Sequence, residues 1–149
     1  MGRKILAVAS GLVTAWGVIL IHKIIATDVG WAPANLEYMR RAEITAYFST
    51  QPTGTYVTLL IGSITAAFFA GYIVTNMSRR ESPGISLSMI TGSILVLTGI
   101  LNFVFLPGQP VWLIAATLLS YIPVTLIGHS FANGPGRPRL DPVVHSGAN

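Results

Sequence analysis

The chain is poor in charged side chains and contains no cysteine. Only 9% of its 149 residues are Asp, Glu, Lys or Arg, whereas about 25% is typical of soluble domains. Without cysteine the protein has no disulfide, thiolate metal site, covalent c-type haem or thiol catalysis. Hydrophobic residues make up 52% of the chain, and its mean hydropathy is +0.65. This composition indicates a protein whose main solvent is lipid.

Charge is absent from the interiors of four long apolar stretches, at residues 5–25, 56–77, 85–106 and 111–128. Each is close to the ~20 residues that a helix needs to cross ~30 Å of hydrocarbon. We therefore predict an all-α polytopic membrane protein with four transmembrane helices, forming one domain over residues 1–130. Little of the chain remains for a separate water-facing domain.

The first apolar stretch can be mistaken for a secretory signal. Its length exceeds that of an ordinary signal core, and Ile24-Ile25-Ala26 is a poor cleavage site. We therefore expect this stretch to remain as the first transmembrane helix.

Lys and Arg are unequally divided between the two sides of the predicted membrane. An even number of helices places both termini on one side, and basic residues near the membrane ends favour the cytoplasm. The side of the termini carries Arg3, Lys4, Arg79, Arg80, Arg137 and Arg139, whereas the other side carries Lys23, Arg40 and Arg41. We predict cytoplasmic termini. The net charge of +4 then reports topology rather than nucleic-acid binding.

A short helix is predicted within the first connection, over residues 35–49. Pro33 precedes it and Pro52 follows it, as start and stop signals do. Its mixture of apolar and charged side chains suits an extracytoplasmic helix lying at the interface. Glu37 and Arg41 have the spacing of a stabilising pair. We expect a cap over the bundle; the alternative is a lid that binds a ligand or partner.

Two further connections have clear turn or loop composition. Residues 107–110 read Pro-Gly-Gln-Pro, so the third and fourth transmembrane helices are expected to form an antiparallel hairpin. Residues 131–149 are rich in Gly and Pro and are predicted to form a flexible cytoplasmic tail.

Small residues form two rows on the second transmembrane helix, with successive members four positions apart. Such rows let helix backbones approach closely. We expect them to pack within the chain, and a homodimer or partner surface is the alternative. The two rows are Gly62, Ala66, Ala70 and Ser63, Ala67, Gly71.

Polar side chains form one stripe on the third transmembrane helix. Hydroxyl and amide groups on one helix face hydrogen-bond to a neighbouring helix or line a polar path. Asn102 is expected deep in the bundle and is the first residue to test. The stripe consists of Ser88, Thr91, Thr98 and Asn102.

His22 and His129 are weak candidates for a functional site. The predicted topology places them at opposite membrane faces, so they cannot ligate one metal within a single chain. We interpret them as interfacial polar residues and predict no metal or cofactor. Pro123 is expected to kink the fourth transmembrane helix, because it removes one backbone hydrogen bond.

The order of these features resembles a group of small, functionally uncharacterised bacterial inner-membrane proteins with four helices. The resemblance covers about residues 4–130 and implies the fold and a bacterial inner (plasma) membrane location, but no activity. Similar proteins often carry an acidic residue four positions before the histidine of the first helix, and here that position is Val18. The matching features are residues 4–8 and 11–13, His22, Tyr47, Pro52, Gly54, residues 62–71, Asn102, Pro107, residues 110–112 and Pro123.

No catalytic motif, phosphate-binding loop or dinucleotide fingerprint is visible, so we expect no enzymatic activity. The sequence favours a structural or accessory subunit that forms a homo-oligomer or joins a larger membrane complex. The alternative is a small oligomeric transporter or channel with its polar path along residues 88–102. A haem protein or enzyme that uses His22 or His129 is the third hypothesis.

Overall fold

The computed structural model describes residues 2–28, 38–78 and 85–134. The regular elements in these ranges are all α-helices, which confirms the expected all-α class. The helices in these ranges are α1 (Gly2–Asp28), α2 (Arg41–Ser49), α3 (Thr53–Ser78), α4 (Ile85–Phe105) and α5 (Val111–Ala132).

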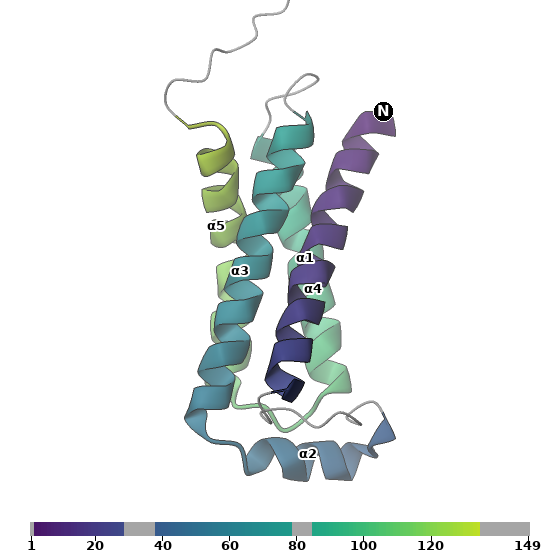
Figure 1. Ribbon diagram of the computed structural model, residues 1–149, viewed down its shortest axis with the longest axis vertical. Coiled ribbons are helices and arrows are strands. Elements are labelled where there is room, and N and C mark those ends of the chain that lie inside the picture. The colour runs from purple at the N-terminus through teal and green to yellow at the C-terminus, as the bar shows by residue number, and fades with distance from the viewer. Residues whose placement is uncertain (1, 29–37, 79–84, 135–149) are drawn as a thin grey trace, which may run out of the picture.

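Four long helices run side by side, and α2 lies across one end of them (Figure 1). We call this the α2 end; the far end carries the start of α1 and the last turn of α5. Even α4, with 21 residues, spans about 32 Å at ~1.5 Å per residue. Among the described residues, these four helices are long and apolar enough to cross a membrane, which is expected of a multi-pass membrane protein.

The observed ends of α1, α2 and α5 differ from those that the sequence predicts. Helix α1 continues to Asp28, so His22 lies almost two turns before its end rather than at it. Helix α2 begins at Arg41, and residues 35–37 of the predicted helix lie outside the described residues. Helix α5 continues through Gly128 to Ala132, because this glycine is a close-packing position and not a helix stop.

The central helix is α3, which packs against α1 on one side and α5 on the other. The row of Gly62, Ala66 and Ala70 faces α1: a Cβ on Gly11 of α1 would come 3.0 Å from the Ala70 carbonyl oxygen. All three residues of this row are buried. The chain's own first helix therefore occupies this small-residue face.

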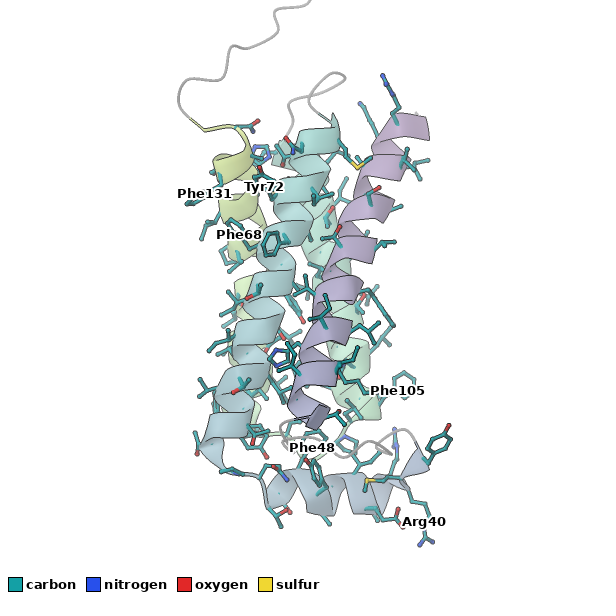
Figure 2. All side chains as sticks on the ribbon, viewed as in Figure 1. Arg40, Phe48, Phe68, Tyr72, Phe105 and Phe131 are labelled. Carbon is teal, nitrogen blue, oxygen red and sulfur yellow. The ribbon has the colours of Figure 1, made fainter. Side chains whose placement is uncertain are left out.

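Helix α5 occupies the second small-residue face of α3 even more closely. A Cβ on Gly71 would collide with the Thr125 carbonyl oxygen, and a Cβ on Gly128 would collide with the Phe68 carbonyl oxygen. Such contacts between backbones are how small residues hold membrane helices together. Beside them, the rings of Phe68 and Phe131 meet edge to face with centroids 5.5 Å apart (Figure 2).

Helix α2 is held against the bundle by a small apolar cluster. Ile44 and Phe48 are buried against Tyr56 of α3 and Leu113 of α5, and Figure 2 shows Phe48 reaching from α2 towards the long helices. The Tyr56 hydroxyl donates a hydrogen bond to the Phe48 carbonyl oxygen. Because these contacts bridge α3 and α5, they fix α2 across the end of the bundle.

Hydrogen bonds cap the start of α2 and join it to α4, and a close contact joins it to the turn between α4 and α5. The backbone N–H of Arg40 donates to Glu43 Oε2 at 3.0 Å, which caps the start of the helix. Arg41 Nη2 donates to the Val104 carbonyl oxygen at 3.1 Å, near the end of α4; Glu37, its expected partner, lies outside the described residues. Gly108 has φ +97 and packs against Thr45, so the turn between α4 and α5 supports α2.

Candidate functional site

A cavity of about 420 Å³ lies in the half of the bundle next to α2. This volume falls within the ~300–1,000 Å³ of ordinary small-molecule sites. The described helices all contribute to its wall. Its lining residues are Trp16, Ile19, His22, Lys23 and Ala26 of α1, Tyr47 and Phe48 of α2, Thr55, Thr58, Leu59, Gly62 and Ser63 of α3, Thr98, Gly99, Asn102, Phe103 and Leu106 of α4, Gln109 of the turn, and Leu113, Thr117 and Tyr121 of α5.

Tyr121 bounds the cavity on the side of the bundle centre. Gly99 makes room for this ring, because a Cβ on Gly99 would come 2.8 Å from Tyr121 Cε2. Beyond Tyr121 the centre of the bundle is filled by a buried cluster that includes Ala15, Ala66 and Leu95. The cavity therefore extends only partway through the bundle.

His22 is the least satisfied polar residue of this wall. Its Nε2 is buried and has no hydrogen-bond partner among the residues that the structure describes. Leaving such an atom unpaired costs about 1–3 kcal/mol. The ring lies against Gly62, where a Cβ would come 2.9 Å from His22 Cγ. The small side of α3 thus accommodates an imidazole whose hydrogen-bonding capacity the protein does not use fully.

The seam between α1 and α4 is the loosest helix contact beside the cavity. Helix α1 packs chiefly along α3 and touches α4 much less. On the α1 side of this seam, Trp16 is 67% exposed and Ile19 is 41% exposed although both line the cavity. On the α4 side, Asn102 is also exposed. Along this seam the cavity is therefore bordered by partly exposed side chains.

The predicted polar stripe of α4 divides between two environments. Thr98 and Asn102 line the cavity, whereas Ser88 and Thr91 are buried in the other half of the bundle. Leu95, which is 5% exposed, separates the two pairs. The stripe therefore does not border one continuous space in this structure.

Asn102 lies in a different place from the one expected. It is in the last turn of α4, close to its end at Phe105, and its side chain is exposed at the edge of the cavity. The bundle does not bury this side chain, and helices α1 and α4 make few contacts with each other.

His129 joins three helices at the far end of the bundle. Its Nδ1 lies 2.9 Å from Thr75 Oγ1 and 3.2 Å from Ser88 Oγ, and its Nε2 lies 3.1 Å from Asn133 Nδ2. Because an amide nitrogen donates, Nε2 accepts and the ring proton belongs on Nδ1, where it is donated to Thr75. The Thr75 hydroxyl in turn donates to the Gly71 carbonyl oxygen at 2.8 Å. The neutral ring is thus fully satisfied.

A serine beside a histidine also invites a catalytic interpretation, since Ser88 is within reach of His129. Ser88 is 1% exposed and Thr75 is 3% exposed, so no substrate reaches either hydroxyl in this structure. We therefore interpret the group as an interhelical connection between α3, α4 and α5.

The two histidines of the described chain are far apart. His22 contacts Gly62 and His129 contacts Thr75; these positions on α3 are separated by about 20 Å at ~1.5 Å per residue. No group of three or more potential metal ligands exists within residues 2–28, 38–78 and 85–134. His145 lies outside these ranges.

Comparison with known proteins adds no relative. No family model matches this chain, and no curated protein or solved structure does. The resemblance to small bacterial inner-membrane proteins therefore stays a prediction, and function has to be argued from the geometry of the cavity.

Sequence reasoning missed the cavity itself. Gly62 was expected only as a packing residue and no role was predicted for Trp16 or Tyr121, yet all three line the cavity. One signal was present in the sequence: a glycine in an otherwise alanine-rich row indicates a close contact, and here that contact is the His22 ring.

Proposed function

We propose that this protein is a non-enzymatic binding protein of the bacterial inner membrane that holds a small, lipid-soluble molecule within its helix bundle. Both termini are cytoplasmic in this proposal, and α2 lies at the extracytoplasmic interface and covers the cavity. The binding cavity then occupies the outer half of the bilayer.

The observation that carries this proposal is the buried Nε2 of His22, which no described residue partners, beside a cavity of about 420 Å³. A buried polar atom without a partner is rare, and a bound molecule supplies one. Small-molecule sites combine mainly apolar walls with a few polar groups in this way.

The accessory-subunit hypothesis loses its original support. Both small-residue rows of α3 are occupied by α1 and α5, so Ala66 and Ala70 are not available to a second chain. A homo-oligomer or larger complex has to use another surface. Native mass spectrometry after mild extraction tests this, and a defined heteromeric assembly would restore the hypothesis.

The transporter alternative is supported by Thr98 and Asn102, which line the cavity. It requires a path onward to the far end through the centre of the bundle, where Leu95 and Ala66 are packed. Transport therefore needs the centre of the bundle to open. Liposome flux that falls in an Asn102→Leu variant would favour this alternative over simple binding.

Filling the cavity tests the binding function directly. Thr98→Phe places a ring in the cavity at low structural cost, because the Thr98 hydroxyl bonds only to its own helix, at the Ile94 carbonyl oxygen, 2.8 Å away. Thr65→Phe is the matched control: the Thr65 hydroxyl likewise bonds to the Ile61 carbonyl oxygen at 2.8 Å, and Thr65 does not line the cavity.

The measurement is mass spectrometry of solvent extracts from protein purified out of native membranes. We expect a stoichiometric small molecule with the wild type and Thr65→Phe and its loss from Thr98→Phe. The same content in all three proteins would contradict the proposal.

A further inference from the structure

Thr117 on α5 is a second polar side chain of the cavity wall whose hydrogen bonding is incomplete. It is 3% exposed and lines the cavity. Its hydroxyl forms no hydrogen bond with another described residue, whereas its carbonyl oxygen accepts one from the Ser120 side chain. The hydroxyls of Thr91, Thr98 and Thr125, by contrast, each donate to the carbonyl oxygen four residues earlier. The Thr117 hydroxyl is therefore available to a bound molecule.

Thr117 and His22 lie at about the same depth on opposite walls of the cavity. Helices α3 and α5 both run away from the α2 end, where Tyr56 and Leu113 pack in one cluster (Figure 1). Gly62, which contacts the His22 ring, follows Tyr56 by about 9 Å at ~1.5 Å per residue. Thr117 follows Leu113 by about 6 Å on the same scale. Because α1 and α5 flank α3 on opposite sides, the two side chains border the cavity from both of those sides.

The imidazole of His22 has its Nε2 on the side away from Gly62. The ring atoms nearest to a Cβ at position 62 are Cγ, Cδ2 and Nδ1, at 2.9, 3.0 and 3.0 Å. Nε2 lies beyond them, is buried, and has no partner among the described residues. The part of the ring that needs a partner is therefore not the part that packs against α3.

The polar groups that the wall leaves for a ligand are uncharged in kind. Lys23 lines the cavity but has a partner of its own in the chain, so we give it no part in holding a ligand charge. None of the described lining residues is Asp or Glu. An imidazole nitrogen and a hydroxyl remain, and both form hydrogen bonds with a neutral oxygen.

Aromatic rings line the cavity from four different helices. Trp16 of α1, Phe48 of α2, Phe103 of α4 and Tyr121 of α5 all contribute to the wall. Contacts between aromatic rings, stacked or edge to face, stabilise a pair beyond what its buried area supplies. The wall therefore suits a flat ring better than a flexible chain.

We propose that the cavity takes a quinone-type lipid, that is, an uncharged flat ring with carbonyl oxygens on opposite edges and a hydrocarbon tail. His22 Nε2–H donates to one carbonyl oxygen and the Thr117 hydroxyl donates to the other. The tail leaves through the seam between α1 and α4, where Trp16 and Ile19 are partly exposed. This inference rests on the proposed binding function and names its ligand class.

Matched ring probes test the proposal on the full chain in phosphatidylcholine nanodiscs. The probes share a decyl tail and carry a para-quinone ring, the corresponding hydroquinone, a plain benzene ring or a benzoate. Native mass spectrometry of the nanodiscs gives the fraction of chains with one bound probe. Infrared spectroscopy of the quinone probe gives a second readout, because a hydrogen bond lowers the carbonyl stretching frequency relative to the same probe in empty nanodiscs.

Two matched pairs of variants accompany the wild type. Thr117→Val removes the unused hydroxyl, and Thr98→Val removes a hydroxyl that also lines the cavity but bonds to the Ile94 carbonyl oxygen of its own helix. His22→Leu removes the ring nitrogens, and His22→Gln keeps a hydrogen-bond donor.

We expect the quinone probe to reach half saturation at about tenfold lower concentration than the plain ring. Thr117→Val and His22→Leu should each raise that concentration about fivefold, as the loss of one hydrogen bond does. Each should also shift a carbonyl band towards its position in empty nanodiscs. Thr98→Val and His22→Gln should stay close to the wild type.

Different results separate failure of the inference from failure of the binding function. If Thr98→Phe abolishes probe binding but the plain ring, hydroquinone or benzoate binds as tightly as the quinone, the ligand class is wrong and the binding function stands. Equal effects of Thr117→Val and Thr98→Val would also overturn the inference. If no probe saturates and extracts of the native protein contain no stoichiometric molecule, the binding function fails, and the inference fails with it.

Discussion

The imidazole of His22 on α1 lies directly against Gly62 on α3. A Cβ at position 62 would come 2.9 Å from His22 Cγ and 3.0 Å from His22 Nδ1, closer than such atoms normally approach. This contact sets the position of the His22 ring at the edge of the cavity. Gly62 therefore acts on the proposed site through the histidine that it supports.

The first prediction concerns this contact. Gly62→Ala should displace the His22 ring, lower the free energy of unfolding by about 1–3 kcal/mol and weaken ligand binding. Gly17→Ala is the control, because a Cβ there has no atom within 4 Å. An alanine at position 17 should be neutral or stabilising. Equal behaviour of the two variants, in unfolding and in the small-molecule content of solvent extracts, would contradict the role given to Gly62.

The second prediction concerns the close approach of α3 and α5. Gly71→Ala should lower the free energy of unfolding by at least ~2 kcal/mol, because the new Cβ meets the Thr125 carbonyl oxygen and a backbone atom cannot rotate away. Gly54→Ala on the same helix has open space and serves as control. Steric-trapping measurements of unfolding in bicelles check this. Unchanged stability of Gly71→Ala would mean that the two helices do not pack as described.

The third prediction concerns the hydrogen bonds at His129. Thr75→Val removes the acceptor of the His129 Nδ1 proton and should cost about 1 kcal/mol of unfolding free energy, within the range measured for membrane helices. Thr91→Val is the matched control. Thr91 is 0% exposed and its hydroxyl bonds only to the Leu87 carbonyl oxygen of its own helix. That change should be nearly neutral; a larger loss there than at Thr75 would refute the assignment.

The fourth prediction concerns pH and the contact between α2 and the bundle. Burial, and secondarily the nearby Tyr56, raises the pKa of Tyr47 above its ordinary value of 10.0. The folded state therefore retains this proton more strongly than the unfolded state does. The resulting stabilisation is complete below about pH 10 and is lost as pH rises through the folded-state pKa.

Thermal unfolding between about pH 8 and pH 11 checks this prediction, with Tyr47→Phe as the comparison. The wild type should lose stability relative to the variant above about pH 10. Parallel curves for the two proteins over the whole range would show that Tyr47 ionisation does not affect the fold.

The long helices were predictable from local sequence, and their contacts were not. The stretches at 56–77 and 85–106 lie within three residues of the bounds of α3 and α4, because apolar length alone defines a membrane-spanning helix. The end of α1 was placed too early, since His22 and Lys23 were taken as boundary residues although the helix continues to Asp28. Side-chain polarity does not stop a helix whose backbone bonds are all internal.

The candidate site was only partly visible in the sequence. Thr98 and Asn102 were singled out, and both line the cavity, but Ser88 and Thr91 of the same stripe belong elsewhere. Periodicity shows that four residues share a helix face. It does not show that the neighbouring helices cover one part of that face and leave another part open.

The amino-acid sequence by itself determined the lipid-compatible composition, the all-α class and the four long apolar helices. These follow from local properties, because hydrocarbon requires about twenty apolar residues and internally bonded backbone. The tertiary structure decided that α1 and α5 cover both small faces of α3, that His22 lies against Gly62, and that a cavity remains beneath α2. Helices that are apolar all round do not specify which face turns inward, so only the packing of the whole bundle settles these contacts.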